Sequence, residues 1–284
     1  MQPPVFIAGL AEIADRYDAL LCDAWGVIHD GERLFAGVAE ALTEFRRTRG
    51  PVLVLTNAPR PSSIIPGQLD RLGLPRAAYD GVVTSGDATR AAIEAMLPAR
   101  AFKLGPEKDD GLYEGLSIEF APMDDAGFII CTGLFDDQRE TPDDYVGLLA
   151  EAARRNLPMI CANPDIVVRW GGRLVYCAGA LAQIYDRLGA RVVYGGKPHS
   201  PIYDLALARL RVAAGRDIAK ARTLAIGDGL ATDIGGANAQ GIDALYVTGE
   251  GGVHDGASDE RAVITALAKA GAHAAYAIGG LQWR

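Results

Sequence analysis

The sequence predicts an α/β fold whose core is a doubly wound, Rossmann-like parallel sheet. Short, almost uninterrupted apolar runs near the N-terminus, at residues 19–23, 51–56 and 81–85, alternate with segments of helical periodicity. The same alternation returns near the C-terminus, where residues 223–228 and 244–248 resemble strands. Continuous apolar runs are typical of strands that are buried on both faces of a parallel sheet. Strands that alternate with helices indicate right-handed βαβ units, which build such a sheet.

Local signals place helices between these strands. In residues 39–50, Ala41, Leu42 and Phe45 form one apolar helix face, and Gly50 is a stop signal. A glycine- and alanine-rich segment separates the two C-terminal strands and also predicts a helix. The last helix and strand are expected at residues 258–271 and 273–278.

The middle of the chain predicts a second α/β unit inserted into the first. Its expected elements are, in order, a helix at 87–97, a strand at 127–135, a helix that begins at Thr141 and Pro142, a strand at 157–163 and a helix at 175–189. Threonine and proline are favoured at the N-cap and first turn of a helix. We therefore predict an α/β cap domain at residues 86–194, and a discontinuous core at residues 1–85 and 195–284.

Composition narrows the class of protein. The chain has 284 residues, of which 49% are hydrophobic and 23% charged, the balance of a soluble globular protein. A net charge of −8 argues against nucleic acid as a partner. No apolar run reaches the length of a membrane span, and the first basic residue is Arg16, so we expect neither a membrane anchor nor a signal peptide. The four cysteines form no C-x-x-C pair, which favours reduced, buried thiols in a cytoplasmic protein.

Polar side chains follow the predicted core strands at the point where each strand ends. Asp23, Thr56 and Asp228 hold these positions, Asp233 lies five residues after Asp228, and Lys197 precedes a predicted helix. Ligands of open α/β sheets bind outside the carboxyl ends of the strands, so these groups should converge there. Carboxylates are the ligands that Mg²⁺ prefers, while a lysine and a threonine hydroxyl suit a phosphate. The set predicts phosphoryl transfer with a carboxylate nucleophile.

Four ordered motifs resemble those of the haloacid dehalogenase (HAD) superfamily. They are Asp23-x-Trp25-Gly26-Val27, Thr56-Asn57, Lys197-Pro198 and Gly227-Asp228-x-x-x-Thr232-Asp233. The predicted insertion lies between the second and third motifs. Its size and the sequences ICANPD (160–165) and CAGA (177–180) are similar to the NagD-like subgroup with a large type-IIA cap.

The resemblance implies a role for each motif residue. Asp23 would be the nucleophile that forms an aspartyl phosphate, and Thr56 would bind the transferring phosphoryl group. Asn57 would support the turn, and Lys197 would hold nucleophile and phosphate together. The implied cofactor is Mg²⁺, with protein ligands from Asp23, the backbone carbonyl of Trp25, Asp228 and Asp233.

Trp25 departs from the family pattern. Most phosphatases of the superfamily have a second aspartate at this position, which protonates the leaving oxygen and then activates water. An indole N–H is a hydrogen-bond donor only. Three histidines, His29, His199 and His254, are candidate substitutes, although each is more commonly a loop or surface residue. Trp25 itself could pack, cover the phosphate or line a substrate pocket.

We therefore expect a Mg²⁺-dependent phosphohydrolase or phosphotransferase that acts on a small phosphorylated metabolite. Two alternatives stay open: an Asp-nucleophile hydrolase of a carbon–halogen or carbon–phosphorus bond, and a non-catalytic protein that binds a phosphometabolite. A large cap excludes macromolecules, and cap surfaces could pair in a homodimer. Beyond the catalytic set, the candidate substrate-binding residues are Gly26, Arg60, Asn163, Pro164 and Asp165.

Overall fold

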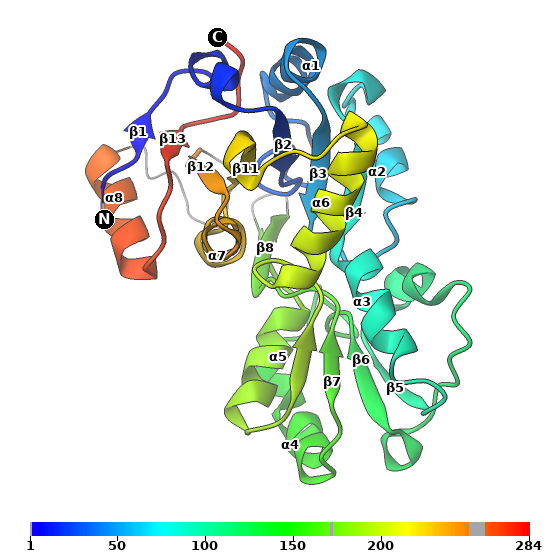
Figure 1. Ribbon diagram of the computed structural model, residues 1–284. Helices are drawn as coiled ribbons and strands as arrows, with labels where there is room; N and C mark the ends of the chain where they lie inside the picture. Colours follow the sequence, from blue (N-terminus) through cyan, green and yellow to red (C-terminus); the bar gives the residue numbers. More distant parts are fainter. Residues whose placement is uncertain (1, 171–172, 250–258) are drawn as a thin grey trace.

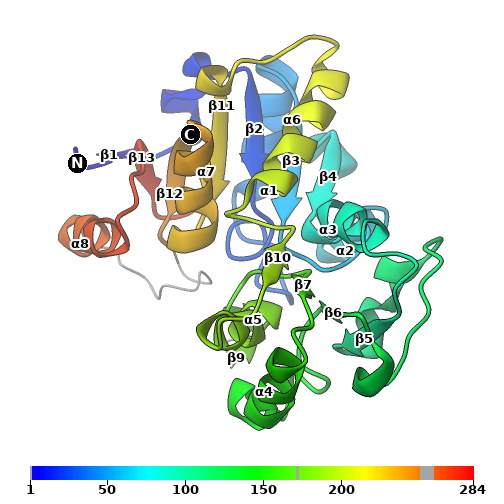
Figure 2. The same ribbon diagram turned by 60° about the horizontal axis from the view of Figure 1, so that its bottom comes forward.

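The computed structural model describes residues 2–170, 173–249 and 259–284, which form two parallel sheets and a two-stranded antiparallel ribbon (Figures 1 and 2). The larger sheet has, in spatial order, the strands β1 (Val5–Phe6), β13 (Tyr276–Ile278), β12 (Asp243–Val247), β11 (Thr223–Gly227), β2 (Ala19–Cys22), β3 (Val52–Thr56) and β4 (Gly81–Thr84). All its strand pairs are parallel. The predicted fold class is confirmed.

Helices cover both faces of the larger sheet, because its strands are apolar on both sides. One core contains α1 (Val38–Thr48) and α2 (Ile65–Leu72). The opposite core contains α6 (Ser200–Ala214), α7 (Gly235–Gln240) and α8 (Glu260–Ala270). Along β2, Leu20 belongs to the first core and Leu21 to the second, as expected from the two-residue period of a strand. All four cysteines are buried and form no disulfide.

The smaller sheet is formed by strands that lie between β4 and β11 in the sequence. Its spatial order is β10 (Val192–Tyr194), β7 (Met159–Cys161), β6 (Phe128–Cys131) and β5 (Ala101–Leu104), and every pair is parallel. The helices α4 (Val146–Arg154) and α5 (Ala178–Arg187) pack on one face, and α3 (Ser85–Glu94) packs on the other. This is the inserted α/β unit, here called the cap. The boundaries near residues 86 and 194 stay predictions, because α3 contacts both α6 and β7.

Several short strands differ from the sequence expectation. Residues 175 and 176 were expected to begin a helix, but they lie in β9 (Arg173–Tyr176), and α5 begins at Ala178. Val175 pairs with Val168 of β8 (Val167–Trp170), so the two strands form an antiparallel ribbon. The strands β1, β5 and β10 were not predicted, because two to four residues carry too little local periodicity and gain strand structure from their partners.

The two parallel sheets turn their carboxyl ends toward a common cavity of about 440 Å³. From the core, residues that follow β2 and β3 line it, including Trp25 and Arg60. From the cap, residues that follow β5, β6 and β7 line it, including Pro106, Thr132 and Asn163. Figure 1 shows the larger and the smaller sheet end to end. The carboxyl end of a parallel sheet is where such folds bind ligands, and here two such ends meet.

Among the described residues, no helix is both long enough and apolar enough to cross a membrane. The longest, α6, has 15 residues and carries charged side chains.

A pair of matched substitutions tests the assignment of the first core. Val38 in α1 is completely buried, whereas Val212 in α6 is 82% exposed. Val38→Ala should lower the free energy of unfolding by about 2 kcal/mol, through lost burial and a residual void. Val212→Ala should change it by less than about 0.5 kcal/mol. Urea denaturation measures both; equal effects would contradict the packing of α1.

Candidate active site

Three carboxylates lie together at the carboxyl ends of adjacent core strands. Asp23 follows β2, Asp228 follows β11, and these strands are direct neighbours in the sheet. The backbone N–H of Asp23 donates to the carbonyl of Ile226 at 2.8 Å, which continues the pairing to the end of both strands. Asp233 belongs to a single π-helical turn, Leu230–Ile234, that returns to the same point. Carboxylate oxygens of the three residues lie within 4.8 Å of one another, and all three residues are buried.

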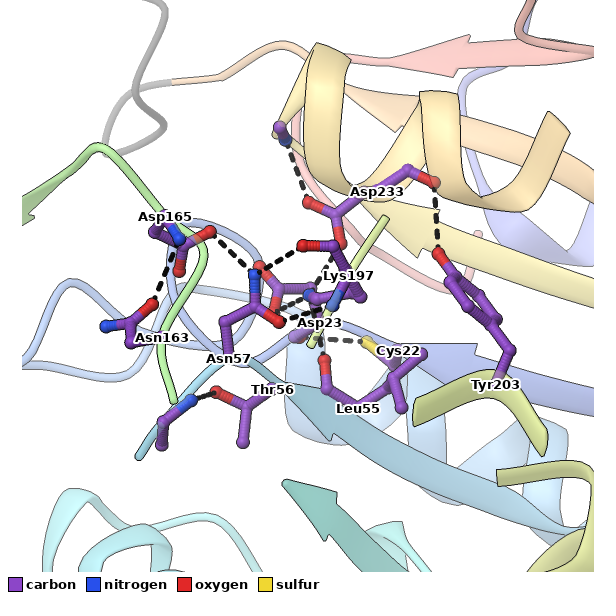
Figure 3. Close-up of polar contacts among 12 residues, drawn as sticks. Cys22, Asp23, Leu55, Thr56, Asn57, Asn163, Asp165, Lys197, Tyr203 and Asp233 are labelled. Atoms are coloured by element: carbon purple, nitrogen blue, oxygen red, sulfur yellow. Dashed lines mark hydrogen bonds and ion pairs between the residues drawn. The ribbon is translucent and has the colours of Figure 1, made fainter. Parts of the chain in front are cut away.

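Lys197 joins two of these carboxylates. Its ammonium donates to Asp23 Oδ1 at 2.7 Å, to Asp233 Oδ1 at 2.6 Å and to the carbonyl of Leu55 at 3.0 Å (Figure 3). All three donors of the ammonium are thereby used, and the residue is only 2% exposed. Burial by itself would lower the pKa of Lys197, but the carboxylates, Asp23 and Asp233 foremost, hold the pKa well above its usual value.

Two glycines make room for this cluster. Gly26 has φ +84°, and a Cβ there would lie 2.4 Å from an oxygen of Asp228. A Cβ at Gly227 would lie 2.2 Å from the Cβ of Asp233. Contacts this short exclude any side chain, so glycine is needed at both positions for the carboxylates to approach. The structure therefore gives Gly26, a predicted substrate contact, a place beside Asp228.

The cluster fits a hard divalent cation. Burial raises the pKa of Asp23 well above its usual range, the charge of Asp233 adds to the rise, and Lys197 opposes it. Three carboxylates outnumber the ammonium that bridges two of them, so the group has an excess of negative charge that a cation would balance. The donors are all oxygen atoms, which suits Mg²⁺ or Ca²⁺ better than a softer metal.

The second motif continues the site along the neighbouring strand. Thr56 ends β3, lines the cavity, and accepts the backbone N–H of Ala58 at 3.3 Å. Asn57 was expected to support the turn. Its side chain connects three segments, because it bonds to both backbone groups of Lys197 and to the carboxylate of Asp165 in the cap.

Trp25 connects the loop that follows β2 to the cap. Its indole N–H donates to the backbone carbonyl of Arg169 in β8 at 2.7 Å. Its ring lies 5.6 Å from that of Trp170 and 5.1 Å from that of His29, measured between centroids. The only hydrogen of the indole that can be donated is therefore used on the cap. The aromatic trio lines the cavity.

The three candidate histidines occupy different places. His29 is buried and lines the cavity, and its Nδ1 accepts the N–H of Gly31 at 3.0 Å. Burial lowers the pKa of His29 to about 4, with partial opposition from Asp30, so this imidazole is neutral near pH 7. His199 is exposed, precedes α6 and stacks on Tyr194. His254 lies outside the described residues.

The predicted substrate contacts meet at the boundary between core and cap. Arg60, Asn163 and Asp165 line the cavity, and Pro164 packs close to Gly196. The side chain of Arg60 is held by Asp109, whose Oδ1 accepts from Nε at 2.8 Å. Asn163 accepts the N–H of Asp165 through its side-chain oxygen at 3.1 Å.

Sequence reasoning missed Asp109 and the ribbon β8–β9. A signal for the ribbon was present: two short, β-rich segments, VVRW and RLVY, are separated by Gly-Gly, which is typical of a hairpin. Asp109 carries no such signal, since it lies in the charged segment EKDDGLY and only the tertiary structure shows its contact with Arg60.

Comparison with known proteins places the chain in a family. Two family models match: a haloacid dehalogenase-like hydrolase model at residues 20–117, and a HAD-hydrolase-like model at residues 194–273. No curated protein sequence matches the chain. A haloacid dehalogenase-like hydrolase from Brucella suis 1330 has 42% identity and a TM-score of 0.88, with 97% of this chain and 100% of that chain covered.

Two further solved structures are similar. A possible sugar phosphatase from Cytophaga hutchinsonii has 22% identity and a TM-score of 0.78, with 97% and 98% of the two chains covered. At that identity the likeness concerns the fold. A glycerol phosphate phosphatase from Mycobacterium tuberculosis, solved with magnesium, has 25% identity and a TM-score of 0.63, with 85% and 70% covered. The same enzyme has also been solved with calcium.

The resemblance predicted from the four motifs is thus confirmed over nearly the whole length of the chain. The match to the Brucella suis hydrolase exceeds what fold similarity alone would give, and the two family models cover the segments that carry the motifs. This protein belongs to the haloacid dehalogenase-like hydrolase family.

Proposed function

We propose that this protein is a Mg²⁺-dependent phosphohydrolase that acts on a small phosphorylated metabolite through an aspartyl phosphate on Asp23. The observation that carries the proposal is the buried ion-pair network in which Lys197 bridges Asp23 and Asp233 beside Asp228. A mixed cluster of this kind suits a phosphate and its counterion. It adjoins the cavity through Ala24 and Thr56, which line the cavity beside Asp23. A 25% identical relative is a glycerol phosphate phosphatase solved with magnesium, which supports the same chemistry.

The proposed roles are those that the family resemblance implies, and contacts of Lys197 and the position of Thr56 support them. An oxygen of Asp23 attacks phosphorus, the bond from phosphorus to the leaving oxygen breaks, and an acyl phosphate forms on Asp23. Lys197 holds Asp23 in place and offsets charge on the phosphoryl oxygens. Thr56, at the adjacent strand end, offers its hydroxyl to the same group. Attack by water then releases inorganic phosphate and restores the carboxylate.

Asp23, Asp228 and Asp233, whose carboxylates lie together, would hold the metal ion. The family resemblance adds the backbone carbonyl of Trp25 as a further ligand. When bound, the ion supplies positive charge that stabilises the phosphoryl oxygens during transfer. The protein residues contribute the oxygen ligands, the lysine that spaces two of them and the glycine that lets Asp228 approach.

Trp25 restricts the leaving group. Its N–H is directed to the carbonyl of Arg169, and the neighbouring His29 is neutral near pH 7 because burial lowers its pKa to about 4. Neither side chain is a strong acid for the departing oxygen. We infer a preference for aryl or acyl phosphates, whose leaving groups depart without protonation, over alkyl phosphates.

A panel of phosphorylated metabolites, assayed for phosphate release with and without Mg²⁺, tests the function. We expect Mg²⁺-dependent release from a subset of small substrates. Asp23→Asn should reduce turnover by at least about 10³-fold while the fold persists, since Lys197 retains Asp233 and the Leu55 carbonyl as acceptors.

Three results would contradict the proposal. Halide release without Mg²⁺ would identify a dehalogenase, and tight Mg²⁺-dependent ligand binding without product would identify a binding protein. An Asp23→Asn variant that keeps a tenth of wild-type activity would show that Asp23 is not the nucleophile.

Asp228→Ala should weaken Mg²⁺ binding by more than about 100-fold. Substitution of residues that only contact a metal ligand already weakens binding by about 10- to 100-fold. The reason for the larger effect is the loss of a carboxylate from a hard-cation site. Calorimetric titration with Mg²⁺ measures the effect without substrate. Asp204→Ala on the exposed side of α6 is the control and should bind Mg²⁺ like the wild type. Equal affinities in the two variants would remove Asp228 from the metal site.

Trp25→Asp should raise the ratio of kcat/KM for an alkyl phosphate to that for an aryl phosphate by about 10–10³-fold, because a carboxylic acid protonates the leaving oxygen. The ratio is the appropriate measure, since the hydrogen bond to Arg169 and the ring volume are lost for both substrates. Trp25→Phe is the control: it removes the N–H without adding an acid, so its ratio should stay at the wild-type value. The same ratio in both variants would mean that the reaction needs no acid at this position.

A further inference from the structure

One cap loop is fastened against the loop that carries the active-site lysine. The loop 163–165 follows β7, and Gly196 precedes Lys197. A Cβ on Gly196 would lie 2.7 Å from the Cδ of Pro164 and 2.4 Å from Oδ1 of Asn57. On its other side, a Cβ on Gly179 would lie 2.1 Å from the carbonyl oxygen of Pro164. The cap loop is therefore packed between the start of α5 and the lysine loop, with space for glycine only on both sides.

Asn57 uses its whole amide at this boundary. Its Oδ1 accepts the backbone N–H of Lys197 at 2.7 Å, and its Nδ2 donates to the carbonyl of Lys197 at 3.1 Å. The second hydrogen of Nδ2 goes to Oδ1 of Asp165 at 2.9 Å (Figure 3). An amide rotated by half a turn would place its oxygen against the Asp165 carboxylate and the Lys197 carbonyl, which are both acceptors. Asp165 therefore helps to select the amide orientation that grips the backbone of Lys197.

The chain of contacts continues into the nucleophile. The backbone of Lys197 is fixed by Asn57, and its ammonium reaches Asp23, Asp233 and the Leu55 carbonyl. A shift of this backbone would move the ammonium away from Asp23. A single path thus leads from the cap, through one side chain of the core, to the group that positions the nucleophile.

The electrostatic environment of Asp165 is consistent with its contact to Asn57 and its proximity to Lys197. Asp165 lines the cavity and keeps some accessible surface there, yet burial raises the pKa of its carboxyl to about 6, while the charge of Lys197 and the Asn57 hydrogen bond oppose the rise. A partly desolvated carboxylate costs free energy unless it is paired and hydrogen-bonded. Here both compensations come from the lysine–asparagine unit.

Other polar contacts between core and cap take different routes. The indole of Trp25 bonds to the carbonyl of Arg169, and Arg60 pairs with Asp109. Neither pair includes Lys197 or Asn57. They hold the cap close to the core, whereas the Asp165 contact reaches the catalytic lysine.

We propose that Asp165 of the cap is a positioning residue that orients Lys197 through Asn57, so that docking of the cap loop completes the arrangement of the nucleophile. The proposal rests on the phosphohydrolase function proposed above. It assigns Asp165 an action on the lysine in place of the substrate contact expected from the sequence.

Steady-state kinetics of Asp165→Ala and Asp165→Asn, with p-nitrophenyl phosphate and acetyl phosphate, test the role. In Asp165→Ala, kcat should fall about 10- to 100-fold, the range for a lost hydrogen bond to a charged group. The fall should be equal for both substrates, with little change in KM. Asp165→Asn keeps an acceptor for Asn57 and should restore most of kcat. A substrate-dependent rise in KM with unchanged kcat would show that Asp165 contacts substrate and would overturn the proposal.

Hydrogen exchange at the amide of Lys197 provides a readout that needs no activity. This N–H is protected by Oδ1 of Asn57, and Pro198 has no amide hydrogen to confuse the measurement. Exchange in a peptide that covers residues 195–199 should accelerate in Asp165→Ala and return to the wild-type rate in Asp165→Asn.

Asp109→Ala is the matched comparison, since Asp109 is a buried cap carboxylate that pairs with a different core residue. It should leave the exchange of Lys197 unchanged. Wild-type exchange in Asp165→Ala, or equal acceleration in Asp109→Ala, would overturn the proposal whether or not the protein hydrolyses phosphate. A wild-type protein without activity but with the expected exchange would contradict only the proposed function.

Discussion

The structure of the site depends on one buried ammonium. Lys197 places its positive charge between Asp23 and Asp233, and all its donors are used in doing so. Without that charge, burial and the repulsion from Asp233 and Asp228 would raise the pKa of the Asp23 carboxyl further. The rest of the core serves this contact: β2 and β11 are neighbours, the π-helical turn returns Asp233 to the strand end, and Gly227 gives it space.

The second organising feature is the meeting of two sheet ends. Each parallel sheet presents its carboxyl edge to the cavity, so the cap contributes loops of the same kind as the core. Core loops that begin at the strand ends reach across the boundary: Trp25 to Arg169, Asn57 to Asp165, Arg60 to Asp109. The groups that would perform the chemistry and the groups that hold the cap are thus neighbours in sequence. In the proposal made above, docking of the cap loop acts on the active site through one of these contacts, that between Asn57 and Asp165.

Trp25 lies in one of these core loops and contacts the cap. In place of an acid, the position holds a side chain whose single donor is used on the cap and whose ring packs on His29 and Trp170. This side chain therefore contributes a hydrogen bond to the cap and an aromatic wall near Asp23. Trp25 supplies no acid at this position. The neighbouring His29 is neutral near pH 7, because burial lowers its pKa to about 4. The proposed preference for leaving groups that need no proton rests on this same contact of Trp25.

The amino-acid sequence was sufficient to predict the class of fold and the main core strands along the chain, because these depend on local apolar runs. It also predicted Asp23, Thr56 and Asp228 at strand ends, Asp233 in the loop that follows and Lys197 before a helix. Their convergence was also predictable, since parallel strands align their carboxyl ends. Contacts in the folded chain were needed to define the short strands β1, β5 and β10, the partner of the Trp25 indole, and the path from Asp165 through Asn57 to Lys197. These features join residues far apart in the chain, and their energies come from pairing, burial and geometry across the boundary between core and cap. Local periodicity carries no record of such contacts, so a carboxylate expected to face the substrate could bond to an asparagine instead.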